Sequence, residues 1–351
     1  MTAPPPVLDL DDAASLQAAD SLGALRSAAL AGAQVRATAT AVDEGALARL
    51  QDLRPRSIVF VTGSGRAARA AALLIGAVGE QAGLPLLQVT AAPPWVGPLD
   101  VVVVAGDDSG DPRLAESVAR ATRRGAEVVV AAPEAGPLRT VAAGRTALLP
   151  PRVRVLDQHT MIRFVAVGIA VLAAVDGTRS AAVLPELAQL ADALDGEALR
   201  DHPRNEVFHN PAKALAARMQ GRRVVFAGDG AACAELARHA VELLLRTTGT
   251  VAAAADLGDA VAAVPRLRAT AAPADYDPFF HDEQLDGPAP ASPVRVLVLS
   301  TEPDERKIAI FDDADLIAVD GERGRTLADL SVLTVRLEMA AAYLQLLGGM
   351  S

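Results

Sequence analysis

Two short loops of this sequence contain residue types that could bind a ligand. Residues 107–111 read DDSGD and follow the apolar run VVVVAG, and residues 63–65 read GSG and follow SIVFVT. Glycine lets the backbone approach an anion, and the free amides at the start of a helix attract one. Three carboxylates within five residues could instead hold Mg²⁺ through oxygen ligands. The acidic loop could therefore bind an anion, bind a metal, or carry only solvated charge.

The acidic loop, residues 107–111, also carries a local signal for a helix start. Asp111 precedes Pro112, the pair expected at an N-cap and a first helical position, and Gly125 after two arginines is typical of a helix end. We therefore expect Asp111 to cap a helix over 112–124. The favoured interpretation of Asp107 and Asp108 is solvated loop charge, and no metal site is predicted.

The glycine loop, residues 63–65, approximates a dinucleotide-binding pattern, since GSGRAA differs from Gly-x-Gly-x-x-Gly only in its last residue. A dinucleotide site also needs an acidic side chain at the end of the next strand to hold the ribose, and that strand ends LLQVTAAP. We therefore expect neither NAD nor FAD, and no other cofactor. Gly63, Ser64 and Gly65 could bind an anion or a sugar phosphate, or could form a tight turn with nothing bound.

Few other residues have the spacing of a catalytic site. No two histidines stand at metal-ligand spacing and no serine lies in a Gly-x-Ser-x-Gly turn, so zinc and serine-hydrolase chemistry lack support. Glu242, in ARHAVELLLR, has apolar neighbours in sequence that could raise its pKa and suit it to proton transfer. The simpler interpretation of Glu242 is an exposed helix glutamate.

Composition argues against several classes of function. The chain of 351 residues has a net charge of -10 and only two lysines, Lys213 and Lys307, so no basic surface for nucleic acid is expected. Its one cysteine, Cys233, excludes a disulfide framework and fits a reducing cytoplasm. The longest apolar segment, 164–175, is too short to span a bilayer, and the N-terminus carries no export signal. We expect a cytoplasmic protein with no membrane or nucleic-acid partner, in which segment 164–175 is a core helix.

The elements that must position these loops alternate between strand and helix. β-rich runs occur at 57–61, 85–90, 100–104 and 127–131, with a weaker one near 147, and helical segments follow several of them. This alternation predicts a parallel sheet covered by helices on both faces. Further helices are expected before residue 50, at about 158–175 and at 184–194.

The strand and loop pattern then restarts, which indicates a duplicated module. IVFVTGSGRAARAAALL matches VVFAGDGAACAELARHA, and DVVVVAGDDSGD matches VRVLVLSTEPDE. We place the boundary near 198–203 and predict an N-terminal domain over residues 1–200 and a C-terminal domain over 201–351. A proline-rich insertion at 272–293 interrupts the second copy, and a last helix covers about 327–347.

The duplicated module and its loops together resemble the sugar isomerase (SIS) domain family, in particular the bifunctional phosphoglucose/phosphomannose isomerases and their TobH-like relatives. The resemblance is carried by GSGRAARAAALL, VVVVAGDDSGDPRLAES and VVFAGDGAACAELARHAVELLL, and by the closing segment that begins VLVLSTEPDE. It covers nearly the whole chain. It implies two tandem α/β domains, each a parallel sheet flanked by helices on both faces, a sugar-phosphate ligand and a homodimer.

The resemblance implies a ligand-binding role for the two loops. The family's phosphate loop, Ser-x-Ser-Gly-Asn-Thr, falls on residues 107–112. Ser109 and Gly110 match it, whereas Asp107 and Asp111 stand where the family has Ser and Asn. The family's first glycine-rich loop falls on residues 63–65.

The resemblance also implies catalytic residues. Glu242 is the best match to the glutamate that moves a proton between C1 and C2 of the sugar, and Arg154, in preference to Arg152, matches the family's basic residue. The family's His-His-Asn run falls on residues 256–259, which read DLGD. His281, in the insertion, could stand in for the missing histidine.

Two hypotheses for the function follow. The first is an aldose–ketose isomerase that interconverts glucose 6-phosphate or mannose 6-phosphate with fructose 6-phosphate, with Glu242 as the base and both loops holding the phosphate. The second is an inactive relative that binds a sugar, a nucleotide sugar or a partner protein in the same cleft. The architecture favours the first, and the hydroxyls and histidine missing from the family's motifs favour the second.

Overall fold

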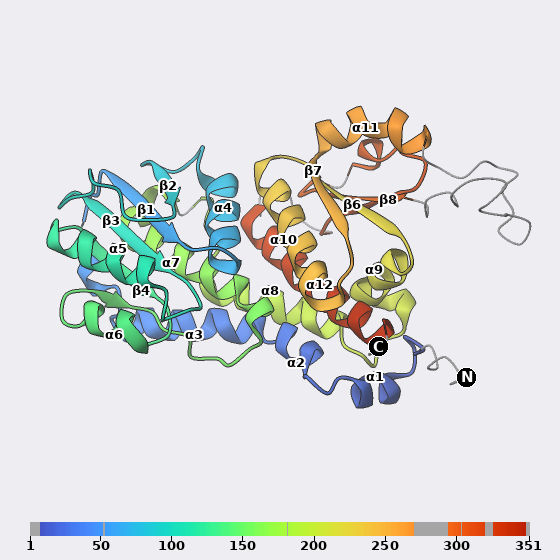
Figure 1. Ribbon diagram of the computed structural model, residues 1–351, viewed down its shortest axis with the longest axis horizontal. Coiled ribbons are helices and arrows are strands. Elements are labelled where there is room, and N and C mark those ends of the chain that lie inside the picture. The colour runs from blue at the N-terminus through green and yellow to red at the C-terminus, as the bar shows by residue number, and fades with distance from the viewer. Residues whose placement is uncertain are drawn as a thin grey trace, which may run out of the picture.

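Two parallel sheets flanked by helices form the protein, as the sequence predicts (Figure 1). The computed structural model describes residues 8–51, 53–180, 182–269, 294–302, 304–319 and 326–348. The predicted insertion, and His281 with it, lies outside the described residues.

The first sheet contains β1 (Ser57–Thr62), β2 (Leu86–Val89), β3 (Asp100–Ala105), β4 (Glu127–Ala131) and β5 (Ala147–Leu148) in the order β2-β1-β3-β4-β5. Strands β1 and β3 are buried along their whole length. Their alternate side chains face two cores, as expected of a sheet covered on both sides. One core includes α5 (Pro112–Arg123) and α6 (Gly136–Ala142), and the other includes α4 (Arg66–Val78) and α7 (Met161–Ser180).

The second sheet repeats this topology. It contains β6 (Arg223–Gly228), β7 (Ala252–Asp256), β8 (Val294–Leu299) and β9 (Ala314–Ile317) in the order β7-β6-β8-β9. This is the order of β2, β1, β3 and β4 in the first sheet, and the described residues show no equivalent of β5. Side chains of α10 (Ala231–Thr248) and α12 (Thr326–Leu347) join the core on one face, and α11 (Leu257–Ala269) contributes to the core on the other. The shared strand order supports the predicted duplication.

A layer of helices connects the two sheets. α3 (Ala31–Asp43) packs on α7 and α8 (Leu187–Arg200), and α8 and α9 (Pro211–Met219) pack on α12. The remaining helices of the described chain are short: α1 (Ala13–Ala19), α2 (Ala24–Ala28), and the 3-10 turns η1 (Ala48–Leu50), η2 (Asp157–His159), η3 (Val207–His209) and η4 (Glu305–Lys307). One continuous apolar core therefore contains residues of both copies.

The structure corrects the end of one predicted helix. We expected a helix over 184–194 and a polar connection after it, but α8 continues to Arg200. The polar residues of this last stretch are not all solvated, because the buried carboxylate of Glu197 accepts a hydrogen bond of 2.6 Å from Arg336 Nε on α12. A buried ion pair thus stabilises a segment that looks like a linker in the sequence.

Two helices are long and apolar enough to cross a membrane, by length and composition alone. They fall in 157–176 and 326–347, and 78% and 83% of their most apolar windows are buried inside the protein. The predicted core segment 164–175 lies in the first, and its burial confirms that it is a core helix.

Candidate functional site

The two predicted loops lie side by side at the carboxyl ends of β1 and β3. These strands are neighbours in the sheet, and a Cβ atom placed on Gly63 would lie 3.5 Å from Asp111 Oδ2. From β1 the chain crosses to β2 on one side, and β3 lies on the other side. Parallel sheets bind ligands at such a point, where the strand order reverses. We call the edge formed by residues 63–66 and 106–111 the loop edge.

The start of α4 is the part of the loop edge that is open to an anion. Gly65 has a φ of 84°, a conformation that glycine adopts without strain, and among the described residues no side chain caps α4. The first amides of a helix lack partners within the helix, and the helix dipole adds partial positive charge there. These amides are suited to holding a phosphate group.

The start of α5 is instead capped by the protein itself. Asp111 Oδ1 accepts a hydrogen bond of 2.9 Å from the amide of Arg113, which confirms the predicted N-cap. Asp108 Oδ1 accepts one of 2.7 Å from the amide of Gly110. The carboxylates of the acidic loop therefore point to different partners and do not converge on one metal ion.

Asp107 is an ion-pair partner and not a freely solvated charge. Its Oδ1 lies 3.1 Å from Arg163 Nη2, and its Oδ2 accepts a hydrogen bond of 2.9 Å from Thr160 Oγ1. Both donors belong to the first turn of α7 or to the residue before it. Arg163 is only 4% exposed, so Asp107 neutralises a buried cation. No local pattern in the sequence signals this pair, because Asp107 and Arg163 are 56 residues apart.

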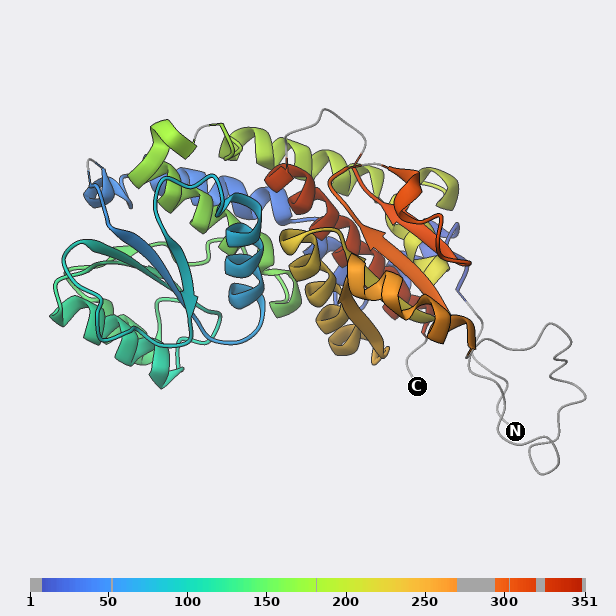
Figure 2. The ribbon, with the colours of Figure 1, turned by 90° about the horizontal axis from the view of Figure 1, so that it is seen from above.

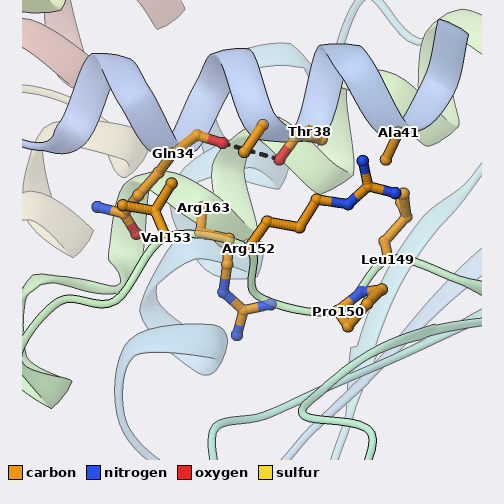
Figure 3. A pocket seen from close by; sticks show the side chains of 9 residues that line it. Gln34, Thr38, Ala41, Leu149, Pro150, Arg152, Val153 and Arg163 are labelled. Atoms are coloured by element: carbon orange, nitrogen blue, oxygen red, sulfur yellow. Dashed lines mark hydrogen bonds between the residues drawn. The ribbon is translucent and has the colours of Figure 1, made fainter.

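A cavity of about 10 Å³ lies beside Arg163, close to the space that one water molecule needs. Figure 3 shows Gln34 and Thr38 of α3 on one side of it and Arg152 and Arg163 among its lining. Gln34 Oε1 and Arg163 Nε are buried there with no hydrogen-bond partner in the described protein.

Glu242 of the second copy reaches the start of α4, next to the loop edge. Its Oε1 lies 2.9 Å from Arg69 Nε, and its Oε2 lies 3.2 Å from Arg66 Nη2. Arg69 also donates to Glu235, about two turns earlier on α10, at 2.7 Å. Of the two interpretations of Glu242, apolar surroundings are wrong and an exposed glutamate is only partly right, because its side chain is 36% exposed and two guanidinium groups from the first copy contact its carboxylate.

The contacts between α4 and α10 run antiparallel. Arg66 and Arg69 near the start of α4 meet Glu242 on α10, while Gly76 near the end of α4 lies against Ala232 at the start of α10. Figure 1 and Figure 2 show the two helices side by side between the sheets. The spacing of the arginines (i, i+3) and of Glu235 and Glu242 (i, i+7) marks facing stripes on the two helices, but this signal could be interpreted only once the helices were known to pair.

Buried titratable groups lie behind Arg66. His239 Nε2 on α10 is 3.4 Å from Glu338 Oε1 on α12, and both residues are fully buried. Burial and the charge of Arg66 lower the pKa of His239 well below its usual value, and burial raises the pKa of Glu338 well above its own. Burial, with Arg66, lowers the pKa of His159 to about 4. Both histidines are therefore neutral near pH 7, and a ligand at the surface does not reach any of the three buried groups.

The remaining predicted residues lie away from these contacts. Arg154 is exposed on the segment between β5 and η2, and Arg152 on the same segment pairs with Glu44 at 2.5 Å. No contact of the described residues joins Arg154 to the loop edge. Ser109 and Gly110 lie on the loop edge, and residues 256–259 lie where β7 ends and α11 begins.

Comparison with known proteins establishes the class of fold. No protein-family model matches the sequence, and no curated protein matches it. Solved structures of phosphosugar isomerases and related proteins match over nearly the whole chain, so the protein has the fold of that class.

Three of these structures show the extent of the similarity. Tagatose-6-phosphate ketose/aldose isomerase from Escherichia coli is 11% identical, with a TM-score of 0.61 over 93% of this chain and 92% of that one. The C-terminal domain of glucosamine-fructose-6-phosphate aminotransferase from Francisella tularensis is 12% identical, with a TM-score of 0.60 over 94% and 96%. A glucose-6-phosphate isomerase like protein from Thermus thermophilus is 20% identical, with a TM-score of 0.51 over 86% of each chain.

Proposed function

We propose that the protein binds a sugar phosphate at the loop edge and isomerises it between aldose and ketose forms, with glucose 6-phosphate or mannose 6-phosphate and fructose 6-phosphate as the substrates. The observation that carries this proposal is the position of Glu242, which the second copy places beside the open start of α4. A carboxylate and an anion-binding helix start in one place are the two parts that such a reaction needs. The fold shared with phosphosugar isomerases supports the same assignment.

In this proposal the phosphate lies against Gly63, Ser64 and Gly65 and the first amides of α4. Arg66 and Arg69 increase the positive potential there. The sugar extends along Ser109 and Gly110. The negative charge of the acidic loop is partly offset, because Asp107 is paired with Arg163 and Asp111 is bound to the start of α5.

Glu242 would carry the proton between C1 and C2. Its two oxygens both accept guanidinium hydrogen bonds, so one arginine must release an oxygen when the substrate enters. The arginine that is released can then stabilise the negative charge that develops on the enediol oxygens. Arg66 and Arg69 would position the carboxylate and balance its charge through the proton transfer.

Proton exchange tests this mechanism directly. The protein is incubated with fructose 6-phosphate in heavy water, and deuterium at C2 of the aldose product is measured by NMR. Loss of a general base typically costs about 10²–10⁴ in rate, so Glu242→Gln should lose exchange by that factor. Glu235→Gln is the matched control, since Glu235 lies on the same face of α10 and also binds Arg69. Wild-type exchange no greater than that of Glu242→Gln would rule out the isomerase.

A second candidate is a sugar-phosphate-binding protein that performs no turnover. It is favoured by the two guanidinium groups on Glu242 and by the burial of His159 and His239. A melting temperature that rises with the concentration of a sugar phosphate, without deuterium exchange, would select it.

The family resemblance also predicts a homodimer in the cytoplasm. Light scattering of the purified protein would measure twice the mass of the 36.1 kDa chain if the prediction is right.

A further inference from the structure

Asp107 occupies a position with the chemistry of an oxyanion site. Thr160 donates to one of its oxygens and Arg163 to the other, at 2.9 Å and 3.1 Å. These two donors are three residues apart at the start of α7, a helix of 20 residues, so the helix dipole also favours negative charge there. A hydroxyl and a guanidinium presented in this way suit two oxygens of a carboxylate or of a phosphate.

Arg163, the cation of this position, is held in place by the protein, whereas Asp107, its anion, is partly exposed. Arg163 is buried, its guanidinium carbon lies 4.0 Å from the centre of the Phe164 ring, and Nη1 donates to the carbonyl of Ala131 at 3.4 Å. Asp107 comes from the acidic loop and its side chain is 34% exposed. The Asp107 side chain is therefore partly open to solvent whereas the Arg163 side chain is not, so an anion from solution could replace Asp107 without moving Arg163.

The surroundings of Arg163 also indicate that its guanidinium could bind an anion. Arg163 and Gln34 line the cavity of about 10 Å³ in Figure 3, and in the part of the chain that the structure describes Arg163 Nε is buried without a hydrogen-bond partner. The guanidinium thus has more donor capacity than the protein uses. Asp107 is the one carboxylate that contacts Arg163 among the described residues.

We propose that Thr160 and Arg163 form an oxyanion-binding position that the chain fills with its own Asp107, and that Asp107 thereby excludes a phosphate group from it. This proposal rests on the proposed function and adds a constraint on how the ligand lies. The phosphate group binds only at the glycine loop, and the uncharged hydroxyls of the sugar lie against the acidic loop. Asp107 is then the residue that sets which part of the ligand lies at each half of the loop edge.

Binding of inorganic phosphate tests this proposal. Isothermal titration calorimetry compares the wild type with Asp107→Ala, in which a phosphate ion can occupy the space of the lost carboxylate. We expect the dissociation constant for phosphate to fall at least about tenfold, the factor that corresponds to a change of about 1.4 kcal/mol. Asp192→Ala is the matched control, because it also removes one carboxylate that pairs with an arginine, Arg36 at 2.7 Å, but on α8 and outside the loop edge, and it should keep the wild-type affinity.

A double variant shows whether the gained site is the one proposed. Asp107→Ala with Arg163→Met should lose the gain, because the buried cation is absent. Equal affinity of wild type and Asp107→Ala, or a gain that survives in the double variant, would overturn the proposal.

A second substitution keeps the test available if Asp107→Ala does not fold. Asp107→Asn preserves the size of the side chain and removes its charge, so its melting temperature should rise more steeply with phosphate than that of the wild type. A rise equal to that of the wild type would also overturn the proposal. These measurements report binding alone, so a failure of deuterium exchange would remove the isomerase and leave the role of Asp107 untouched.

Discussion

The two copies of the module differ in the space around an equivalent glycine, Gly63 in the first copy and Gly228 in the second. Gly63 directly follows β1 and Gly228 ends β6, and each precedes a short loop and a helix. A Cβ on Gly63 would meet only Asp111 Oδ2, at 3.5 Å, whereas a Cβ on Gly228 would overlap the amide nitrogen and the Cα of Ala234. The first loop leaves space above its glycine, and the second is closed by its own helix.

The polar residues beside these glycines also hold the second loop closed and leave the first loop open. At the second loop Asp229 binds Lys307 at 2.7 Å and Ser300 at 2.8 Å, so the loop after β6 is tied to the loop after β8. At the first loop the nearby arginines instead reach the carboxylate of the other copy. The first copy thus has an open edge at its glycine loop, whereas the second has a closed loop and supplies Glu242 to the start of α4.

Alanine at the two glycines gives the largest expected contrast. Gly228→Ala should lower the free energy of unfolding by at least about 3 kcal/mol, because backbone atoms cannot yield to the new methyl group. Gly63→Ala should change it by less than about 1 kcal/mol, since the nearest atom is at ordinary contact distance. Urea unfolding measures both, and equal losses would show that the two loops are packed alike.

The contact between α4 and α10 gives a smaller contrast. A Cβ on Gly76 would lie 2.9 Å from the amide nitrogen of Ala232, so Gly76→Ala must push the helices apart at that end. Overpacking of this kind costs about 1–3 kcal/mol and alanine regains about 1 kcal/mol of helix propensity, which leaves a loss of about 1 kcal/mol. Gly196→Ala, where a Cβ has open space within α8, should be neutral or stabilising in the same urea titration. A Gly76→Ala protein as stable as Gly196→Ala would mean that the helices do not touch closely.

The smallest expected effect is the contribution of Asp229, in the loop after β6, to the free energy of unfolding at low pH. Burial raises the pKa of Asp229, but the hydrogen bonds and charge of Lys307 and the hydrogen bond from Ser300 outweigh it, and the pKa is lowered overall. Its stabilisation is therefore full above the unfolded-state pKa of about 3.9 and is lost as the pH falls through the folded-state value.

Unfolding below pH 5 can isolate this contribution. Asp229→Asn should cost less than about 1 kcal/mol at pH 7, because the pair is partly exposed, and should flatten the loss of stability below about pH 4. Asp256→Asn, at the exposed end of β7, should keep the wild-type acid slope. An unchanged slope in Asp229→Asn would remove this carboxylate from the acid response.

Most of the strands and both loops could be predicted because their signals are local. Runs of valine and isoleucine mark β1, β3, β4, β6 and β8, and the Asp111–Pro112 pair marks the start of α5. Strand β7 was missed because AAAAD contains no β-branched or aromatic residue, so its strand conformation depends on pairing with β6.

The partners of the candidate site residues could not be predicted. Glu242 was identified from the sequence, yet its neighbours Arg66 and Arg69 depend on how α4 crosses α10, and those residues are more than 170 positions away. The same holds for Asp107 and Arg163, which meet only when the acidic loop folds over the start of α7. Long-range ion pairs of this kind can be recognised in the sequence only once it is known which elements pack together.

The continuous apolar core has a consequence for the stability of the two halves of the chain. Because α3, α8 and α12 join residues of both copies in one cluster, neither half can bury the apolar residues of this shared cluster without the other. A proteolytic cut in the connection between α8 and α9 would leave two fragments held together, and separating them would expose both cores. The repeat is therefore visible in the topology of the two sheets, while the shared core ties the stability of each half to the other.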